Sequence, residues 1–431
     1  MTEVRRKTGG LPPIESWRTT NGVQVLFVAR HELPIVDLCL DFDAGSVRDP
    51  EGLSGVAELT RSLLFTGIAR GGGRPALGEE AIEAGFDEVG AELSVDLRPT
   101  CLSIGLRTLA PAAWRDPAID LLARGLAQPR FSPAILAREQ ARLAAWLAEE
   151  AGETERIAER HFAALVFAGH PLGVAPEPER LETITCADIA AFRLRHCGAQ
   201  GATLTLVGDL RREQAEALAQ RVVAGLPPGE AMPLSYALAA PPAQQAWLAH
   251  EASQAHLLLG APVVPAVHAE ALALSIANRA LSWRLNEVVR EQRGLAYDVA
   301  SSLLASRYGV CRIGLKTRSD QAGMALGAVL DTVAAYARDG VDADDFERMR
   351  HESLRGYALA FDSNAKLLRQ VADLAFDGLP LDTFQTWPER VARLTLDQAS
   401  AAFARWLAPQ RLTAVIVGGQ RCGDAAARSL R

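Results

Sequence analysis

Apolar and polar residues alternate along short stretches in the first half of the chain. From 36 to 43, Val, Leu, Leu and Phe alternate with Asp, Cys, Asp and Asp, as in a strand with one face on a core. Asn21-Gly22 is a hairpin signal between Trp17 and the apolar run 23–29. We therefore predict half-buried strands in this region.

Longer stretches carry apolar residues three and four positions apart, which is the helical period. Such stretches predict helices at 53–65, 79–89, 111–127 and 133–150, and two further alternating runs predict strands at 92–97 and 102–108. Strand runs mixed with pairs of helices indicate an α+β fold, with helices packed on one face of a mostly antiparallel sheet.

Two short segments recur along the chain. Ile-Gly-Leu-Arg-Thr at 104–108 returns as Ile-Gly-Leu-Lys-Thr at 313–317, and LTLVGD at 204–209 resembles AVIVGG at 414–419, so the two offsets are 209 and 210. Equal offsets indicate a duplicated unit. A segment rich in proline and alanine separates the copies. We predict an N-terminal domain over 1–225, a linker over 226–245 and a homologous C-terminal domain over 246–431.

Composition excludes several classes of partner. The 431 residues are 49% hydrophobic and 23% charged, which is ordinary for a soluble globular protein. The net charge of −7, without a basic block, argues against nucleic acid. No apolar stretch reaches the roughly 20 residues of a membrane span. The N-terminal residues lack the apolar run of a signal peptide. We expect a cytoplasmic protein, or a periplasmic one if the sequence is a mature form without its signal.

The stretch 284–299 carries the most informative chemistry. Leu285, Val288 and Val289 predict an amphipathic helix that ends at Gly294, and an apolar, strand-like run begins at Tyr297. Arg290 and Tyr297 then flank a helix-to-strand turn. We expect this turn to hold a cation and a phenol close together.

This stretch resembles a motif in a known family. Arg-Gly-Leu-Ala-Tyr at 293–297, preceded by Ser-Trp-Arg-Leu at 282–285, is similar to an element in the second half of zinc peptidases of the pitrilysin and mitochondrial-processing-peptidase family. In that family the arginine and tyrosine matching Arg290 and Tyr297 face bound peptide opposite the metal. The resemblance extends from Trp17 to Gly419, and it implies a duplicated metallopeptidase-like fold.

The first half of the chain lacks the zinc motif that this resemblance leads one to expect. Active relatives carry His-x-x-Glu-His, in which two imidazoles four residues apart bind zinc and the glutamate acts on the metal-bound water. Here Gly55 and Leu59 take the histidine positions and Glu58 takes the glutamate position. No histidine lies between His31 and His161, so a shifted alignment does not restore the motif.

The third ligand of the family is a glutamate on a later helix, and the matching stretch here is 139–146. Trp146 takes the ligand position. For Glu58 and Glu139 the simpler interpretation is a glutamate on a helix surface, and a retained catalytic role for Glu58 is the alternative. We expect no metal and no other cofactor in this chain.

Some bacterial members of the family resemble heterodimers in which one subunit carries zinc and the other carries the arginine and tyrosine. This sequence resembles the second kind. The resemblance implies a homologous partner that bears His-x-x-Glu-His and zinc, a peptide substrate, and a chain that is inactive alone. It also marks Gly90, Ala91 and Glu92 as part of a strand edge to which peptide could add.

Two other interpretations remain. The chain could be an architectural subunit without a catalytic role, like the core subunits of respiratory complexes that share this fold. It could also be a self-sufficient hydrolase, but the sequence offers no nucleophile motif and no metal cluster for one. Arg290 and Tyr297 argue for the peptidase subunit over the architectural one.

Overall fold

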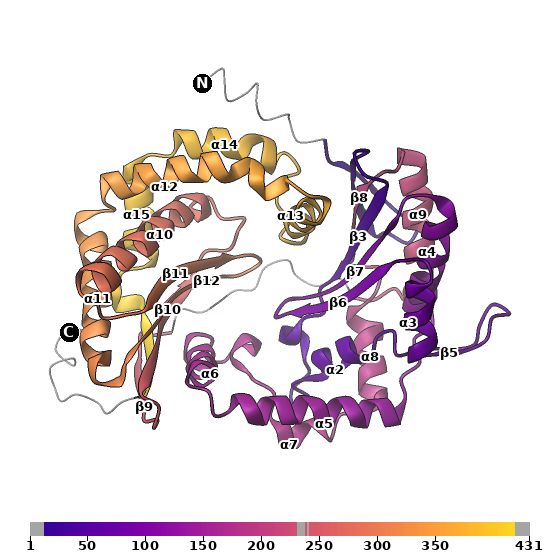
Figure 1. Ribbon diagram of the computed structural model, residues 1–431, viewed down its shortest axis with the longest axis horizontal. Helices are drawn as coiled ribbons and strands as arrows, with labels where there is room; N and C mark the ends of the chain where they lie inside the picture. Colours follow the sequence, from indigo (N-terminus) through magenta and orange to yellow (C-terminus); the bar gives the residue numbers. More distant parts are fainter. Residues whose placement is uncertain (1–12, 231–237, 239–240, 419–431) are drawn as a thin grey trace. The chain divides into compact units, whose positions relative to one another are not determined.

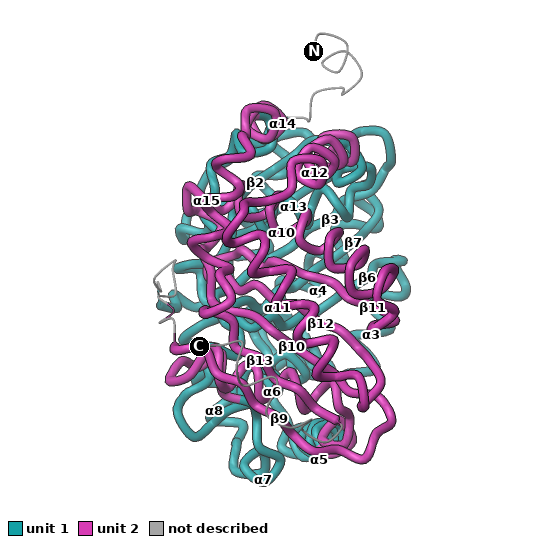
Figure 2. The backbone as a smooth tube through the Cα atoms, turned by 90° about the vertical axis from the view of Figure 1, so that its left-hand side faces the viewer, with its two compact units in different colours: residues 1–147, 175–233, 358–385 teal, residues 148–174, 234–357, 386–431 magenta. Residues whose placement is uncertain are grey.

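The structure, a computed structural model, describes residues 13–230, 238 and 241–418. The chain packs as two compact units (Figure 2), which are each described separately. Unit 1 comprises 1–147, 175–233 and 358–385, and unit 2 comprises 148–174, 234–357 and 386–431. These units follow packing and not sequence order, so the domain boundaries at 225 and 246 stay predictions. Most of the expected linker, 231–237 and 239–240, lies outside the described residues.

Unit 1 is built on a mostly antiparallel sheet of six strands, in which only the β2–β8 pair is parallel. Its order is β1 (Glu15–Arg18), β2 (Gln24–Ala29), β8 (Thr203–Gly208), β3 (Ile35–Phe42), β7 (Cys101–Leu109) and β6 (Glu92–Arg98). The strands predicted at 23–29, 36–43, 92–97 and 102–108 all form, with ends within one or two residues. Strand β6 is an edge of this sheet.

Helices pack on one face of the unit 1 sheet, as the fold class predicts (Figure 1). Four of them contact its strands, namely α2 (Val56–Leu63), α3 (Glu79–Asp87), α4 (Ala112–Ala127) and α9 (Arg212–Val223). The helices α5 (Pro133–Glu150), α7 (Pro178–Leu181) and α8 (Cys186–His196) contribute to the same core. The apolar residues of β3, namely Val36, Leu38, Leu40 and Phe42, are buried in this core. A small pair of strands, β4 (Gly67–Ile68) and β5 (Leu77–Gly78), completes the unit.

The opposite face of β3 is not solvent-exposed, so the prediction of a half-buried strand was wrong. Helix α13 (Asn364–Phe376) packs across β3 and β8 on that face. Asp41 is consequently 0% exposed and accepts hydrogen bonds from the Ser103 hydroxyl and, at 3.3 Å, from the Cys101 thiol. The Arg98 guanidinium lies 3.7 Å from Asp41 and 2.7 Å from Asp373 of α13. A helix from more than 300 residues away covers this face, and local alternation cannot reveal that.

Unit 2 repeats the same sheet topology. Its order is β11 (Asp298–Ala305), β12 (Gly309–Arg318), β10 (Gln254–Val263), β13 (Thr413–Val417) and β9 (Gln245–Leu248), and only β13 and β9 run parallel. The strands β11, β12, β10, β13 and β9 correspond in order to β6, β7, β3, β8 and β2 of unit 1. In both sheets the last two of these strands form the parallel pair. The duplicated fold is therefore confirmed. Residues 104–108 and 313–317 lie on β7 and β12, and residues 204–208 and 414–417 lie on β8 and β13.

The unit 2 sheet is also covered on two faces (Figure 1). One face packs against α10 (Ala271–Leu285), α11 (Ala322–Asp339), α12 (Ala343–Gly356) and α15 (Leu396–Trp406). The other face packs against α6 (Thr154–Val166), whose Phe162 and Val166 contact Leu258 and Val415. The unit boundaries after 147 and after 385 fall within α5 and within α14 (Thr383–Arg393). No helix in the described part of the chain is long and apolar enough to cross a membrane.

The contact between α13 and the sheet gives a test of the packing. In Arg98→Met the apolar stem remains, but buried Asp41 loses its guanidinium. Breaking a buried ion pair typically costs about 3 kcal/mol in the free energy of unfolding. We expect a loss of that order in thermal and urea denaturation. Arg369→Met is the matched control, because Arg369 pairs with the same Asp373 at 3.0 Å but is largely exposed. That variant should lose less than about 1 kcal/mol, and equal losses would contradict the account.

Candidate functional site

Helix α2 occupies the place of the zinc helix, and its first turn is fixed by backbone geometry. Gly55 is the N-cap residue, with a left-handed φ of 104° that favours glycine. A Cβ atom at this position would lie 2.7 Å from Cδ2 of Leu181. The Asp49 carboxylate caps the helix by accepting hydrogen bonds from the N–H groups of Gly55 at 2.7 Å and Ala57 at 2.9 Å. Gly55 therefore has a structural role that no histidine could fill.

The other two positions of the lost motif, Leu59 and Glu58, take part in core packing and in an ion pair. Leu59 is buried in the core of unit 1. The Glu58 carboxylate is paired with the Arg61 guanidinium one helical turn away, with an N–O distance of 2.5 Å. This bond raises the pKa of Arg61. Glu58 is thus a partly exposed glutamate on the helix surface, held in an ion pair with the same helix.

Glu139 on α5 is buried, so its interpretation as a helix-surface glutamate was wrong. It is only 6% exposed, and its carboxylate pairs with Arg138 at 3.0 Å and with Arg142 at 2.6 Å. A carboxylate that is removed from water needs such charged partners, because they offset the free energy lost with its hydration. The aligned ligand position, Trp146, is 48% exposed and offers no metal-binding atom.

Guanidinium groups thus neutralise the two carboxylates that remain between α2 and α5. Arg142 also contacts the Ser62 hydroxyl at 3.4 Å, which joins the two helices. Sequence reasoning missed these arginines, although the i, i+3 spacing of Glu58 with Arg61 and of Glu139 with Arg142 is a recognisable signal. Among the described residues no three His, Cys, Asp or Glu side chains are grouped as a metal site requires.

The predicted peptide-binding residues lie at the start of edge strand β6. Gly90 forms the turn after α3 with a φ of 60°, Ala91 is buried and donates its N–H to the Phe86 carbonyl at 3.0 Å, and Glu92 opens the strand. Within the described chain, the backbone of β6 forms hydrogen bonds only to β7. The outer edge of β6 is thus free to accept another strand.

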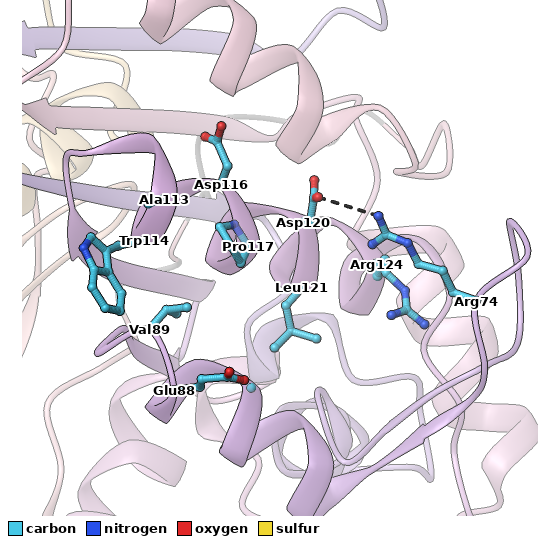
Figure 3. Close-up of a pocket in the computed structure, with 11 residues that line it drawn as sticks. Arg74, Glu88, Val89, Ala113, Trp114, Asp116, Pro117, Asp120, Leu121 and Arg124 are labelled. Carbon is cyan, nitrogen blue, oxygen red and sulfur yellow. Dashed lines mark ion pairs between the residues drawn. The ribbon is translucent and has the colours of Figure 1, made fainter.

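A groove of about 790 Å³ lies beside this turn, between α3 and α4 (Figure 3). Apolar side chains, including Trp114 and Leu121, line it. Its rim is charged, but Asp120 pairs with Arg74 at 3.7 Å and with Arg221 at 2.8 Å. These charges compensate each other, and the groove holds none of the predicted site residues.

The segment with Arg290 and Tyr297 joins α10 to β11. Helix α10 continues from Asn286 to Gln292 as a π-helix, a rare form that is frequent at functional sites. Gly294 ends it with a φ of 61°, where its N–H donates to the Arg290 carbonyl at 3.1 Å and the Leu295 N–H donates to the Val289 carbonyl at 2.9 Å. The predicted stop at Gly294 is confirmed. The strand begins one residue later than predicted, at Asp298.

This junction presents both predicted side chains to solvent. Tyr297 is 88% exposed and Arg290 is also exposed, whereas the intervening Leu295 and Ala296 are buried in the unit 2 core. Within the described residues neither exposed side chain forms a hydrogen bond or an ion pair. The structure therefore shows a phenol and a guanidinium with free donors on an anchored segment, and it records no direct contact between them.

Comparison with known proteins identifies the family of this chain. Residues 183–353 match the family described as the peptidase M16 inactive domain. A crystal structure of a peptidase M16 inactive domain from Pseudomonas fluorescens is 30% identical, with a TM-score of 0.89 over 95% of this chain and 99% of that one. This chain belongs to the peptidase M16 family. The resemblance to zinc peptidases read from the sequence is confirmed.

Two Helicobacter pylori proteins extend the comparison. The non-peptidase homolog YmxG is 22% identical over 407 residues, which are 93% of this chain and 92% of that protein. A crystal structure described as a protease has a TM-score of 0.83 at 15% identity, over 94% of this chain and all of that one, and so shows the fold alone. In the M16 chain described here, Gly55 and Leu59 on the altered zinc helix offer no side-chain ligand for zinc.

The Asp49 cap in this M16 chain predicts a pH dependence of stability. Burial raises the pKa of Asp49 from 3.8 to about 6, although the N–H groups of Gly55 and Ala57 oppose the shift. The folded protein thus binds the proton more tightly than the unfolded chain. The resulting stabilisation, about 3 kcal/mol, is complete below about pH 4 and is lost as the pH rises to about 6. In Asp49→Asn, urea denaturation between these pH values should lose this slope.

Asp188 provides a matched control, because it takes part in the capping box of α8 but is only partly buried. Its hydrogen bonds with Thr185 lower its pKa, so its contribution is lost as the pH falls. Asp188→Asn should therefore change the slope in the opposite sense. An unchanged slope in Asp49→Asn would contradict the role given to Asp49.

Proposed function

We propose that this M16 chain is the metal-free subunit of a two-chain zinc peptidase. It supplies Arg290 and Tyr297 to a peptide held at the zinc of a homologous partner that carries His-x-x-Glu-His. The observation that carries the proposal is the 88% exposure of Tyr297 on a segment anchored by buried neighbours. Holding a large phenol in solvent brings the isolated chain no burial energy. Its position is understandable if a bound peptide covers it.

The chemistry of the two side chains suits this role. The partner's zinc would supply a hydroxide nucleophile. The attacked carbonyl oxygen gains negative charge, and O–H and N–H donors aimed at it bind more tightly in the transition state than in the substrate. The Tyr297 hydroxyl and the Arg290 guanidinium are such donors, and neither is occupied by another residue in the described chain. This chain would thus contribute transition-state stabilisation and no nucleophile.

The free edge of β6 supports a peptide substrate. An extended peptide can add to an exposed strand through main-chain hydrogen bonds, which make few demands on its sequence. Gly90, Ala91 and Glu92 would mark the start of that added pairing. Such binding fits a role in peptide processing with broad substrate tolerance. Peptide binding at β6 forms part of the proposal.

The proposal predicts a loss of turnover in the assembled complex when a donor is removed. Tyr297→Phe keeps the ring and deletes only the hydroxyl, and Arg290→Ala deletes the guanidinium. Removing one transition-state donor typically lowers kcat by about 100- to 1,000-fold. We expect losses of this order in peptide hydrolysis, with unchanged assembly on size-exclusion chromatography because both side chains are exposed.

Arg293→Ala is the matched control, since Arg293 is an exposed arginine at the same helix end and has no proposed role. Its complex should retain wild-type turnover. Full turnover in Tyr297→Phe and Arg290→Ala would instead favour the architectural subunit. Equal losses in all three variants would indicate damage to the junction as a whole.

A further inference from the structure

Three polar residues of α10 and the following π-helix face the edge strand of unit 2. Asn278, Ser282 and Asn286 are spaced by four residues, so they lie one above another on a single helix face. Helix α10 packs directly against β11. Asn278 is 2% exposed, which means that its amide must find partners inside the protein.

Each of these three side chains forms a hydrogen bond with β11. The Asn278 amide donates to the Ser301 carbonyl at 3.3 Å and accepts from the Ser301 hydroxyl at 2.6 Å. The Ser282 hydroxyl accepts from the Ser301 N–H at 3.0 Å, and the Asn286 amide donates to the Val299 carbonyl at 2.7 Å. The three residues form a polar ladder between the helix and the strand.

The ladder occupies the outward-facing side of β11. In an antiparallel edge strand the unpaired backbone groups belong to alternate residues, here Val299 and Ser301. The Val299 carbonyl and both backbone groups of Ser301 bond to side chains of α10 and the π-helix, so an added strand would have to displace these bonds to pair with this part of β11. The equivalent edge strand of unit 1, β6, has no such partners in the described chain. The two duplicated sheets therefore differ at their edges, and β11 is closed where β6 is open.

We infer that Asn286 is the positioning residue for Arg290 and Tyr297, an inference that rests on the proposed function. Asn286 is the first residue of the π-helix that carries Arg290. Its amide holds Val299, which lies two residues beyond Tyr297. One side chain thus ties the two ends of the junction together. Accurate placement of a catalytic group requires such supporting hydrogen bonds, because a misplacement of about 1 Å can cost on the order of 100-fold in rate.

Asn286→Asp tests this role without changing the side chain's shape. The carboxylate has no N–H to donate, and it places an oxygen against the Val299 carbonyl. Gln292→Glu is the matched control, because it makes the same change of amide to carboxylate in the same π-helix, at an exposed residue without a bond to β11. Circular dichroism and thermal denaturation of each variant would show that the fold is retained. Asn286→Ala is the second variant if Asn286→Asp does not fold.

The first readout needs no partner subunit. The chain contains five tyrosines, so fluorine NMR of the protein labelled with 3-fluorotyrosine gives few signals, and Tyr297→Phe assigns one of them. Asn286→Asp should shift or broaden the Tyr297 signal and leave the other signals in place. Gln292→Glu should leave the Tyr297 signal close to its wild-type position. A Tyr297 signal unmoved by Asn286→Asp would overturn the inference.

The second readout is peptide hydrolysis by the assembled complex. Asn286→Asp should lower kcat by about 10-fold or more and change KM by less than about two-fold, since the loss falls on groups that act in the transition state. A larger KM with unchanged kcat would overturn the positioning role. If the Tyr297 signal moves while kcat and KM both stay at wild-type values, Asn286 does fix the junction. In that case the proposed function of Arg290 and Tyr297 is wrong.

Discussion

Burial of both faces of each central sheet is the constraint on which the rest of the structure depends. Helices α13 and α6 cover the faces that the main helical layers leave open, so polar groups in the middle strands must find partners inside the protein. Asp41 meets this need through Ser103, Cys101 and Arg98. With the sheet faces covered, the open edge of β6 and the exposed junction after α10 are the places proposed here for a peptide.

The two units of the duplication differ at the helix that follows β3 in unit 1 and β10 in unit 2. In unit 1 the helix at the zinc position is a packing element, with Gly55 in a left-handed cap, Leu59 in the core and arginines against Glu58 and Glu139. In unit 2 the equivalent region keeps an exposed arginine and tyrosine on a π-helical turn braced by Asn286. The same fold thus lost its metal chemistry in one half and retained exposed polar groups in the other.

Local patterns in the sequence were sufficient for most of the fold. Alternation in 36–43 and helical periodicity in 133–150 predicted β3 and α5, because these signals depend on neighbouring residues only. The covering of β3 by α13, and the ion pairs of Glu139, depend on segments far apart in the sequence or on side-chain geometry. For the same reason the bond between Asn286 and Val299 was not predicted, although both residues flank the motif that was singled out. The exposure of Tyr297 follows from the burial of Leu295 and Ala296, which only the folded chain shows.

The central claim is that this chain works only beside a zinc-bearing partner. The most direct measurement is peptide hydrolysis together with bound zinc, for the purified chain alone and after mixing with a homologous subunit that carries His-x-x-Glu-His. The account predicts neither zinc nor turnover for the chain alone, and strong turnover in the mixture that exceeds that of the partner by itself. Zinc and turnover in the single chain, or a mixture no more active than the partner alone, would contradict it.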